Sequence, residues 1–476
     1  MAGRTVIRGG TVVTASDRYE ADVLIEGERI AAVGDGRDWA ADRVVDARGR
    51  YVLPGGVDTH THLEYPIDGF TTRTSDDFHT GTVAAAFGGT TTIVDFVKKE
   101  PAHSIRDSYL RRAEAAAARC VVDHAFHAIV PPPEQQPDAF DDLVRLAAEG
   151  VTSWKFFMAY PGTQMVDDAT LIEGMRLARE HGVLPMVHAE NGHIVADATR
   201  RLVDSGAVAE HHHHDAHSHI SEGEAVHRAV AIAETVGAPL FVVHVSSRMA
   251  AAEIAAARAR GLQVWAETCP QYLVTAFEDY AGKGADAAAY VCSPPIRERS
   301  NQEHLWRALA TGALSTIGTD HASFCLGQPA DLPPQKGRSK GFFPKVPNGV
   351  PGIEDRLMVM YEAGVAGGRF GLSRFVDLVA TRPAKLFGLY PRKGVVAAGS
   401  DADLVVWDPE ADHVISAATS HMRTDYNLYE GMRVSGRPAQ VFSRGDLIVD
   451  GGTLRAAAGR GRHLARTAPI LNGDLT

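Results

Sequence analysis

Two histidines in the segment "DTHTH" have the spacing expected of a metal site. His60 and His62 are two residues apart, so on a β-strand both side chains leave the same face. Two more histidines end apolar runs, His188 in "PMVHAEN" and His244 in "FVVHVSS", and Asp320 follows a third run in "STIGTDHAS". A buried imidazole needs a polar partner, and a divalent metal shared by these side chains would satisfy that need.

The number of candidate ligands favours two metals over one. A catalytic zinc takes three protein ligands and keeps one position open, whereas a pair of ions uses more ligands and a bridging anion. Lys155, inside the apolar run "TSWKFFMAY", can provide that anion. Burial lowers the pKa of a lysine, and its neutral amine can add CO₂ to form a carbamate. We therefore expect carboxylated Lys155 to bridge two ions; the alternative is a buried stem whose amine reaches water.

These side chains depend on the strands that precede them. Apolar runs alternate with Ala-rich helical stretches, and we expect strands at 57–62, 90–96, 123–130, 152–157, 184–189, 239–245, 262–267 and 314–320. Eight strands with intervening helices are typical of a closed (β/α)8 barrel of the TIM type. Polar residues end nearly every run, Asp95 and Glu267 included. Because barrel enzymes build their sites at the carboxyl ends of the strands, the candidates should meet at one mouth of the barrel.

Both ends of the chain have a different residue pattern from the middle. Short Val- and Ile-rich runs broken by glycines fill residues 1–53 and return in 391–455. We predict that these two segments form one small β-sandwich beside a barrel of residues 54–390. Residues 456–476 look like a tail that is ordered only if it packs on a neighbouring subunit.

Composition narrows the possible partners. The 476 residues carry a formal net charge of −11, without a long basic cluster, so we expect neither nucleic acid nor an anionic membrane as a partner. No run is apolar and long enough for a membrane helix, and the first residues do not resemble a signal peptide. Four widely separated cysteines indicate free thiols and a cytoplasmic protein: Cys120, Cys269, Cys292 and Cys325.

The ordered motifs resemble one known family over most of the chain. They include "YVLPGGVDTHTHLE", "SWKFFMAY", "VHAENG", "CSPPIR", "TDHASF", "VPNGVPGIEDR" and "GSDADLVVWDP". This combination is similar to the dihydropyrimidinase/D-hydantoinase family of cyclic amidases, within the amidohydrolase superfamily. The resemblance implies a metal-dependent hydrolase with two divalent ions, commonly zinc, and an assembly of four or two identical subunits.

The resemblance also implies roles for individual residues. One metal would be bound by His60 and His62, the other by His188 and His244, with carboxylated Lys155 between them and Asp320 completing the first site. Tyr160 would donate a hydrogen bond to the developing oxyanion, while Ser293 and Asn348 would hold the imide edge of the substrate. Asp320 would take the proton from a hydroxide activated between the metals and deliver it to the leaving ring nitrogen. The implied reaction is hydrolytic opening of dihydropyrimidines or 5-substituted hydantoins to N-carbamoyl amino acids.

The residues after the first histidine pair bear on the substrate. Glu64 directly follows "HTHL", and a carboxylate there would disfavour an anionic ring, so a neutral cyclic ureide is expected. Several large side chains in the loops after the first and fourth strands could form an apolar pocket for a substituent: Leu63, Tyr65, Phe70, Phe156, Phe157 and Tyr160.

Two other functions stay open, and one segment departs from the family pattern. An allantoinase or another cyclic amidase would use the same scaffold, and a non-catalytic assembly protein of the collapsin response mediator type would resemble it too. Such proteins have lost metal ligands that this chain retains. The segment 210–225, "EHHHHDAHSHISEGEA", replaces one that usually carries an Arg-Pro pair. We expect its histidines 211–219 to lie in a solvent-exposed loop.

Overall fold

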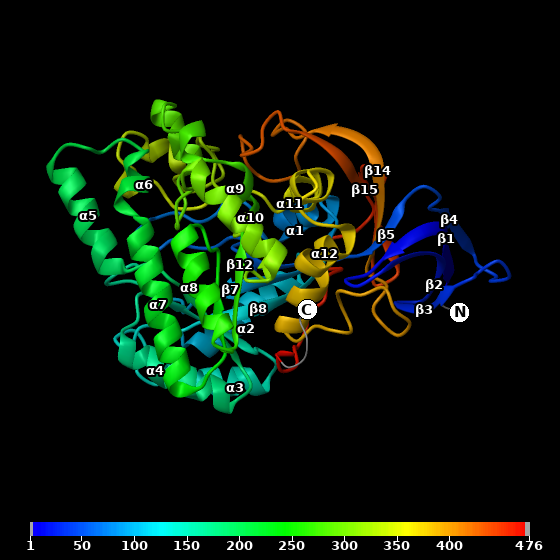
Figure 1. The fold of residues 1–476 in the computed structure, drawn as a ribbon, viewed down its shortest axis with the longest axis horizontal. Coiled ribbons are helices and arrows are strands. Elements are labelled where there is room, and N and C mark those ends of the chain that lie inside the picture. Colours follow the sequence, from blue (N-terminus) through cyan, green and yellow to red (C-terminus); the bar gives the residue numbers. More distant parts are fainter. Residues whose placement is uncertain (1–2, 472–476) are drawn as a thin grey trace.

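The computed structural model describes residues 3–471, which form a barrel with a β-rich part beside it (Figure 1). Eight strands hydrogen-bond in sequence order into one parallel sheet: β6 (Gly56–Thr61), β7 (Thr90–Val97), β8 (Asp123–Ile129), β9 (Ser153–Phe157), β10 (Leu184–His188), β11 (Leu240–Val242), β12 (Val264–Thr268) and β13 (Thr316–Ile317). A parallel bridge between Thr61 and His321 joins the two edges. The (β/α)8 barrel predicted from the sequence is therefore confirmed.

Helices surround the barrel strands (Figure 1). They are α1 (Phe78–Phe87), α2 (Ile105–Ala117), α3 (Ala139–Ala148), α4 (Asp168–Glu180), α5 (Gly192–Asp204), α6 (His212–Ala216), α7 (His219–Val236), α8 (Arg248–Ala259), α9 (Pro270–Val274), α10 (Gln302–Thr311), α11 (Arg356–Met360), α12 (Leu372–Val376) and α13 (Arg382–Leu386). Strand alternation in β9 sends Trp154 and Phe156 into the core shared with the helices, and Phe157 into the core inside the barrel. Lys155 shares the face of Phe157, which is why a lysine sits within this apolar run.

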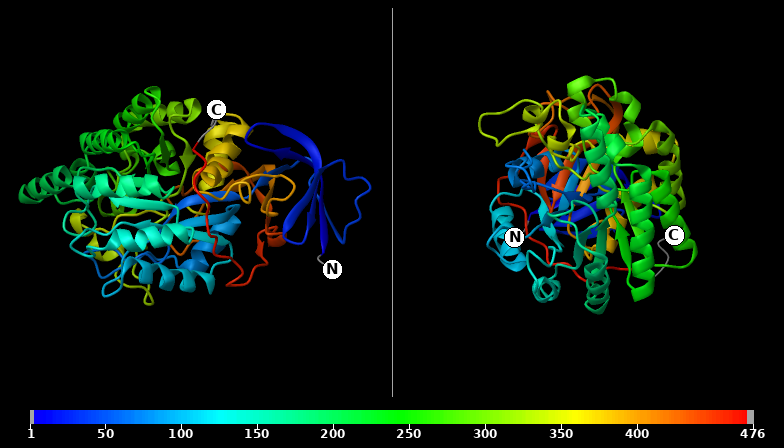
Figure 2. Two further views of the ribbon diagram at one scale, coloured as in Figure 1. Left: turned by 90° about the horizontal axis from the view of Figure 1, so that it is seen from below. Right: turned by 90° about the vertical axis from the view of Figure 1, so that its left-hand side faces the viewer.

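The two ends of the chain form the β-rich part together. Its nine strands hydrogen-bond into one mixed sheet: β1 (Arg4–Val13), β2 (Arg18–Glu26), β3 (Arg29–Gly34), β4 (Arg43–Asp46), β5 (Tyr51–Pro54), β14 (Leu404–Val414), β15 (Arg433–Ser443), β16 (Asp446–Asp450) and β17 (Thr453–Leu454). The join lies where β5 pairs antiparallel with β14, placing Leu53 opposite Val405. In Figures 1 and 2 the blue N-terminal strands lie beside the orange C-terminal ones. This part has its own apolar core, which includes Val12, Val52, Val406 and Phe442.

A buried charge cluster ties the β-rich part to the barrel. The ammonium of Lys393 lies 2.6 Å from Asp123 at the start of β8, 2.9 Å from Asp401 and 2.7 Å from Asp403 just before β14. Arg444 also pairs with Asp123, at 3.0 Å. All these side chains are at most 7% exposed. These contacts fix the start of a barrel strand against the sheet.

The C-terminal segment differs from the sequence expectation. Residues 456–471 run along this chain's own barrel, and the last residues, 472–476, lie outside the described part (Figure 2). Arg466 donates a hydrogen bond to the carbonyl of Phe126 at 2.6 Å, and the backbone of Leu464 pairs with that of His124. Within residues 3–471, no helix has the length and apolar character to cross a bilayer.

Candidate metal centre

One cavity at the carboxyl ends of the barrel strands gathers the predicted metal ligands and the three residues predicted to contact the substrate. Its walls include His60, His62, Lys155, Tyr160, His188, His244, Ser293, Asp320 and Asn348. These residues come from six different barrel strands or from the segments that follow strands, as the placement at strand ends predicted. The structure brings them together; the role of each in binding and catalysis stays a prediction.

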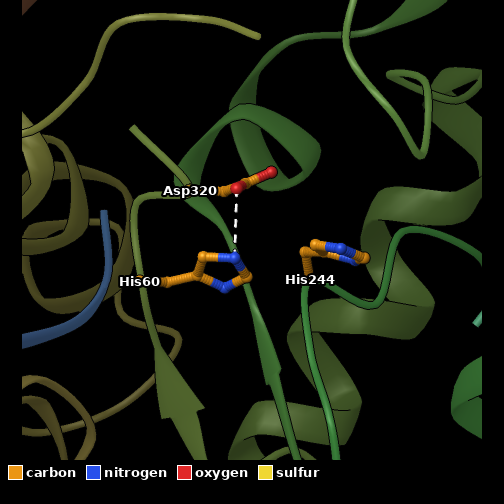
Figure 3. A group of neighbouring side chains, drawn as sticks. All are labelled: His60, His244 and Asp320. Atoms are coloured by element: carbon orange, nitrogen blue, oxygen red, sulfur yellow. Dashed lines mark ion pairs between the residues drawn. The ribbon is translucent and has the colours of Figure 1, made fainter. Parts of the chain in front are cut away.

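Asp320 joins the two histidines of the first strand. One carboxylate oxygen, Oδ1, lies 3.1 Å from His60 Nε2 and 3.2 Å from His62 Nε2. His60, His244 and Asp320 each offer a ligand atom, and these atoms lie within 4.8 Å of one another (Figure 3). A cluster of nitrogen and oxygen donors at this spacing suits a divalent transition metal.

His188 and His244 form a second pair. His188 Nδ1 lies 2.9 Å from His244 Nε2, and His188 Nε2 lies 2.9 Å from a carboxylate oxygen of Glu190. Burial lowers the pKa of both imidazoles, His244 well below its ordinary value, so both rings are neutral near pH 7. Neutral imidazole is the form that binds metal.

Carboxylates behind two of the rings decide which nitrogens face the cavity. The buried Glu267 hydrogen-bonds to His60 Nδ1, and Glu190 does the same to His188 Nε2. The pKa of Glu190 lies well below its ordinary value, so this carboxylate accepts, His188 Nε2 carries the proton, and His188 Nδ1 presents a lone pair. Burial raises the pKa of Glu267 well above its ordinary value, so its hydrogen bond orients the His60 ring without fixing which partner carries the proton. His60 Nε2 faces an oxygen of Asp320 at 3.1 Å, and His188 Nδ1 faces His244 Nε2 at 2.9 Å, so several potential ligand atoms lie close together. The donor set thus fits metal ions.

Lys155 lies among these rings and is 1% exposed. Its Nζ is 3.5 Å from His60 Nε2 and sits over the rings of Phe96 and Phe157, at 4.7 and 5.1 Å from their centroids. Burial lowers the pKa of Lys155 to about 8, although the carboxylates of Asp320 and Glu267 act in the opposite direction. A substantial fraction of the amine is therefore neutral at physiological pH, as the carbamate hypothesis requires.

Three cavity residues adopt backbone conformations that side-chain-bearing residues rarely take. The φ angles are +65° for Tyr160, +40° for His244 and +51° for Asp320. Each such residue costs about 1–3 kcal/mol, and such strain concentrates at functional sites. The rest of the fold holds these three side chains in the orientation that the cavity requires.

Tyr160, Ser293 and Asn348 form a hydrogen-bonded group on the cavity wall. Asn348 Nδ2 donates to Ser293 Oγ at 3.0 Å, and the side chains of both residues hydrogen-bond to the Tyr160 hydroxyl. Burial raises the pKa of Tyr160 above its ordinary value, so the hydroxyl keeps its proton. This group therefore offers several hydrogen-bond donors beside the candidate metal ligands.

Comparisons with known proteins agree with this geometry. Residues 51–448 match the model of the amidohydrolase family. The chain belongs to the amidohydrolase family. It is 45% identical to a D-hydantoinase of Streptomyces coelicolor over 98% of each chain, and 38% identical to a dihydropyrimidinase of Rattus norvegicus over 97% of this chain and 89% of that one. The crystal structure of a dihydropyrimidinase from Brevibacillus agri is similar, with a TM-score of 0.93 at 43% identity, covering 98% of this chain and 99% of that one.

This amidohydrolase positions its candidate ligands through residues that the sequence analysis did not single out for that purpose. These residues, Glu190, Glu267 and His217, are all buried. In the sequence, nothing except their position near a motif indicates that they support a metal ligand. His127 also contributes: its Nε2 lies 3.0 Å from the carbonyl of Thr59, the residue directly before His60. Asp95, expected at the barrel mouth, instead accepts hydrogen bonds from the Leu63 amide and the Thr61 hydroxyl, both at 2.9 Å. It shapes the turn after β6.

The expectation of a solvent-exposed loop at 211–219 is wrong. Residues 212–216 form helix α6, and His213 and His217 are 5% and 6% exposed. His213 Nε2 lies 2.8 Å from the carbonyl of Cys292, and His217 Nδ1 lies 2.8 Å from Glu190. These partners lie far along the chain, so the polar composition of the segment did not reveal its burial.

The prediction that the Glu64 carboxylate lies near the substrate is also wrong. Glu64 does not line the cavity; it makes a two-pronged ion pair with Arg119, at 2.6 and 2.7 Å. Leu63 and Phe156 likewise pack into the core outside the cavity. Of the expected apolar wall, four side chains do face the cavity: Tyr65, Phe70, Phe157 and Tyr160.

Proposed function

We propose that this amidohydrolase hydrolyses cyclic ureides, dihydropyrimidines or 5-substituted hydantoins, to N-carbamoyl amino acids. The observation that carries the proposal is the convergence of four imidazoles, one carboxylate and a buried lysine in a single cavity. Relatives named D-hydantoinase and dihydropyrimidinase, similar over nearly the whole chain, support the substrate class. A non-catalytic assembly protein would have no need for this set of metal-ligand side chains, which this chain keeps in one cavity.

Two divalent ions, zinc by expectation, complete the proposed site. His60 and His62 would hold one ion and His188 and His244 the other, with carboxylated Lys155 between them and Asp320 on the first. The neutral state of the buried rings and the lowered pKa of Lys155 support this assignment. When bound, the ions lower the pKa of water and polarise a carbonyl.

The side chains of the chain then move protons and stabilise charge. Asp320 is placed to accept a proton from the nucleophile and to pass it to the leaving ring nitrogen, acting first as a base and then as an acid. Tyr160 keeps its proton and donates a hydrogen bond to the oxygen that becomes negative. Ser293 and Asn348 hold the imide edge of the ring beside it.

The cavity walls support a neutral substrate. Among the described residues that line it, the only positively ionisable side chain besides the histidines is Lys155. No guanidinium among these residues offers itself to a ring carboxylate. Tyr65, Ile67 and Phe70 lie at the same cavity and suit an apolar substituent.

A substrate panel tests the proposal. Purified enzyme loaded with zinc in bicarbonate buffer is assayed on dihydrouracil, phenylhydantoin, allantoin and dihydroorotate, with appearance of the carbamoyl product as the readout. We expect turnover of the first two to exceed that of the others by at least an order of magnitude. Preferential opening of allantoin would favour an allantoinase, and preferential opening of dihydroorotate would contradict the neutral-substrate argument.

The remaining expectations complete the proposal. We infer a cytoplasmic enzyme that assembles into homotetramers or homodimers and that uses neither nucleic acid nor membrane as a partner. The four cysteines are free and buried, which supports a reducing compartment. Light scattering of the purified protein measures the assembly directly.

A further inference from the structure

A second group of metal-ligand side chains lies outside the catalytic cavity. It consists of His214 in α6, His219 at the start of α7, and Glu298 in the segment before α10. None of the three lines the cavity described above. Each offers one ligand atom, and the three atoms lie within 4.8 Å of one another.

The distances suit a cation held between these side chains. His219 Nε2 lies 3.0 Å from one oxygen of Glu298, and His214 Nε2 lies 3.6 Å from the other. Ligands about 2.0–2.1 Å from a tetrahedral zinc are roughly 3.4 Å apart, so only small side-chain movements are needed. Two imidazole nitrogens and one carboxylate favour a borderline ion such as zinc over calcium or magnesium.

The surroundings of His214 prepare it as a ligand. Its ring stacks on Phe277 at 4.0 Å, and its Nδ1 lies 3.3 Å from Asp215, which directs the proton to that nitrogen. The opposite nitrogen, Nε2, is buried and has no hydrogen-bond partner among the described residues. Burial lowers the pKa of this imidazole, which keeps it neutral. A carboxylate behind a histidine is the usual support of a metal-bound imidazole.

Glu298 is also oriented by its neighbours. Asn301 Nδ2 donates to one carboxylate oxygen at 3.2 Å, and the side chain is about one-third exposed, which leaves room for water to complete the coordination. The nearby positive charge of Arg297 is compensated by the buried Glu222 at 3.1 Å. A cation beside Glu298 therefore meets little repulsion.

We propose that His214, His219 and Glu298 form a further metal site, selective for zinc-like divalent ions, that clamps the α6–α7 segment to residues 297–301. His219 and Glu298 are 79 residues apart in the chain, so the ion would join two distant segments. Between the two histidines lies His217, whose Nδ1 contacts Glu190 and whose carbonyl accepts from Arg297. The bound ion would therefore stabilise the α6–α7 segment, whose His217 contacts Glu190 behind the catalytic cavity.

Metal counting on the full-length enzyme tests the site. The zinc- and bicarbonate-loaded protein is dialysed against buffers of increasing free zinc, and zinc per chain is measured by mass spectrometry. We expect the wild type to bind one more zinc per chain than His219→Gln or Glu298→Gln, while ring-opening activity at saturating catalytic metal persists in all three. The matched control is His227→Gln, which removes another histidine of α7 that is 72% exposed and pairs with Glu253. It should bind as much zinc as the wild type.

A second measurement guards against altered folding of a variant. Added zinc should raise the unfolding temperature of the wild type and of His227→Gln after the catalytic site is filled, and should not raise that of Glu298→Gln, whose amide preserves the size of the side chain. Equal zinc content in the wild type and both site variants would overturn the proposal. An equal loss in His227→Gln would do so too, because it would mean binding to scattered surface histidines.

Discussion

His217 holds Glu190 by a hydrogen bond of 2.8 Å from its Nδ1, and the other oxygen of Glu190 contacts the candidate ligand His188. Burial alone would raise the pKa of Glu190, but the two histidines together hold it well below its ordinary value. The carboxylate is therefore ionised and fixes the orientation of His188. A histidine outside the barrel strands thus reaches the candidate metal site through one carboxylate.

Loss of this contact should weaken metal binding. Groups that orient a metal ligand typically contribute about 10–100-fold to metal affinity or activity, and we expect that loss in Glu190→Gln and in His217→Leu. His217→Gln keeps an N–H donor and should recover part of the affinity. The measurement is zinc retention against a competing chelator, together with kcat.

A buried glutamate elsewhere in the same region provides the control. Glu210 is 2% exposed and accepts a hydrogen bond from the Gly341 amide, without contacting His188. Glu210→Gln should retain normal zinc affinity. Unchanged affinity in Glu190→Gln would show that the carboxylate has no positioning role.

Removal of the Lys155 amine should abolish both metal binding and turnover. In Lys155→Ala the bridging anion cannot form, and the imidazoles lose the group that holds two ions together. Short carboxylic acids such as acetate or propionate should restore part of the activity, because they can enter the vacated space. Sodium chloride at the same ionic strength is the control, and full activity without any added acid would refute the bridge.

Loading of the metal-free enzyme should depend on pH through Lys155. Only the neutral amine adds CO₂, and its fraction grows as pH rises through the lowered pKa of about 8. About one-tenth of the amine is neutral at pH 7, against less than about one-thousandth for an ordinary lysine with a pKa near 10.4. At constant dissolved CO₂, zinc-dependent reactivation should therefore accelerate about eightfold from pH 6.5 to 7.5 and level off above pH 8.5. A rate independent of pH in this range would argue against carbamate formation as the limiting step.

Asp320→Asn should lower the rate of proton transfer and leave the fold unchanged. The amide keeps the size of the side chain but cannot accept the proton, and loss of a general acid–base group costs about 10²–10⁴-fold in kcat. Circular dichroism should show an unchanged fold, and metal content should fall less than activity. A near-normal kcat would remove Asp320 as the proton carrier.

The cluster around Lys393 should contribute strongly to stability. Lys393→Met leaves the carboxylates of Asp123, Asp401 and Asp403 buried with one fewer counter-charge, a change that typically costs about 3–5 kcal/mol. Lys340→Met breaks an exposed pair with Asp286 and should cost less than about 1 kcal/mol. Urea unfolding followed by fluorescence compares the two. Equal midpoints for both variants would contradict the role assigned to the cluster.

The barrel and its cavity could be predicted because their signals are local. Each strand is a short apolar run, and each candidate ligand follows such a run directly, so strand periodicity places His188 or Asp320 without knowledge of distant contacts. The expected strands agree with the observed ones to within a few residues, although β11 and β13 are shorter than expected.

The supporting residues could not be found in the same way. The partner of His60 is Glu267, 207 residues later, and that of His213 is the carbonyl of Cys292, 79 residues later. Glu64 turns away from the cavity because its backbone has φ +39° and Arg119 binds its carboxylate. Such orientations follow from tertiary contacts, which composition and spacing do not encode individually.

The pairing of β5 with β14 has a consequence for synthesis in the cell. During translation the first five strands leave the ribosome long before their partner does, because residues 404–414 follow after the entire barrel. Until then, β5 presents an unpaired edge, a known template for aggregation. We expect nascent chains stalled before residue 404 to bind chaperones through this edge, and completed chains to release them.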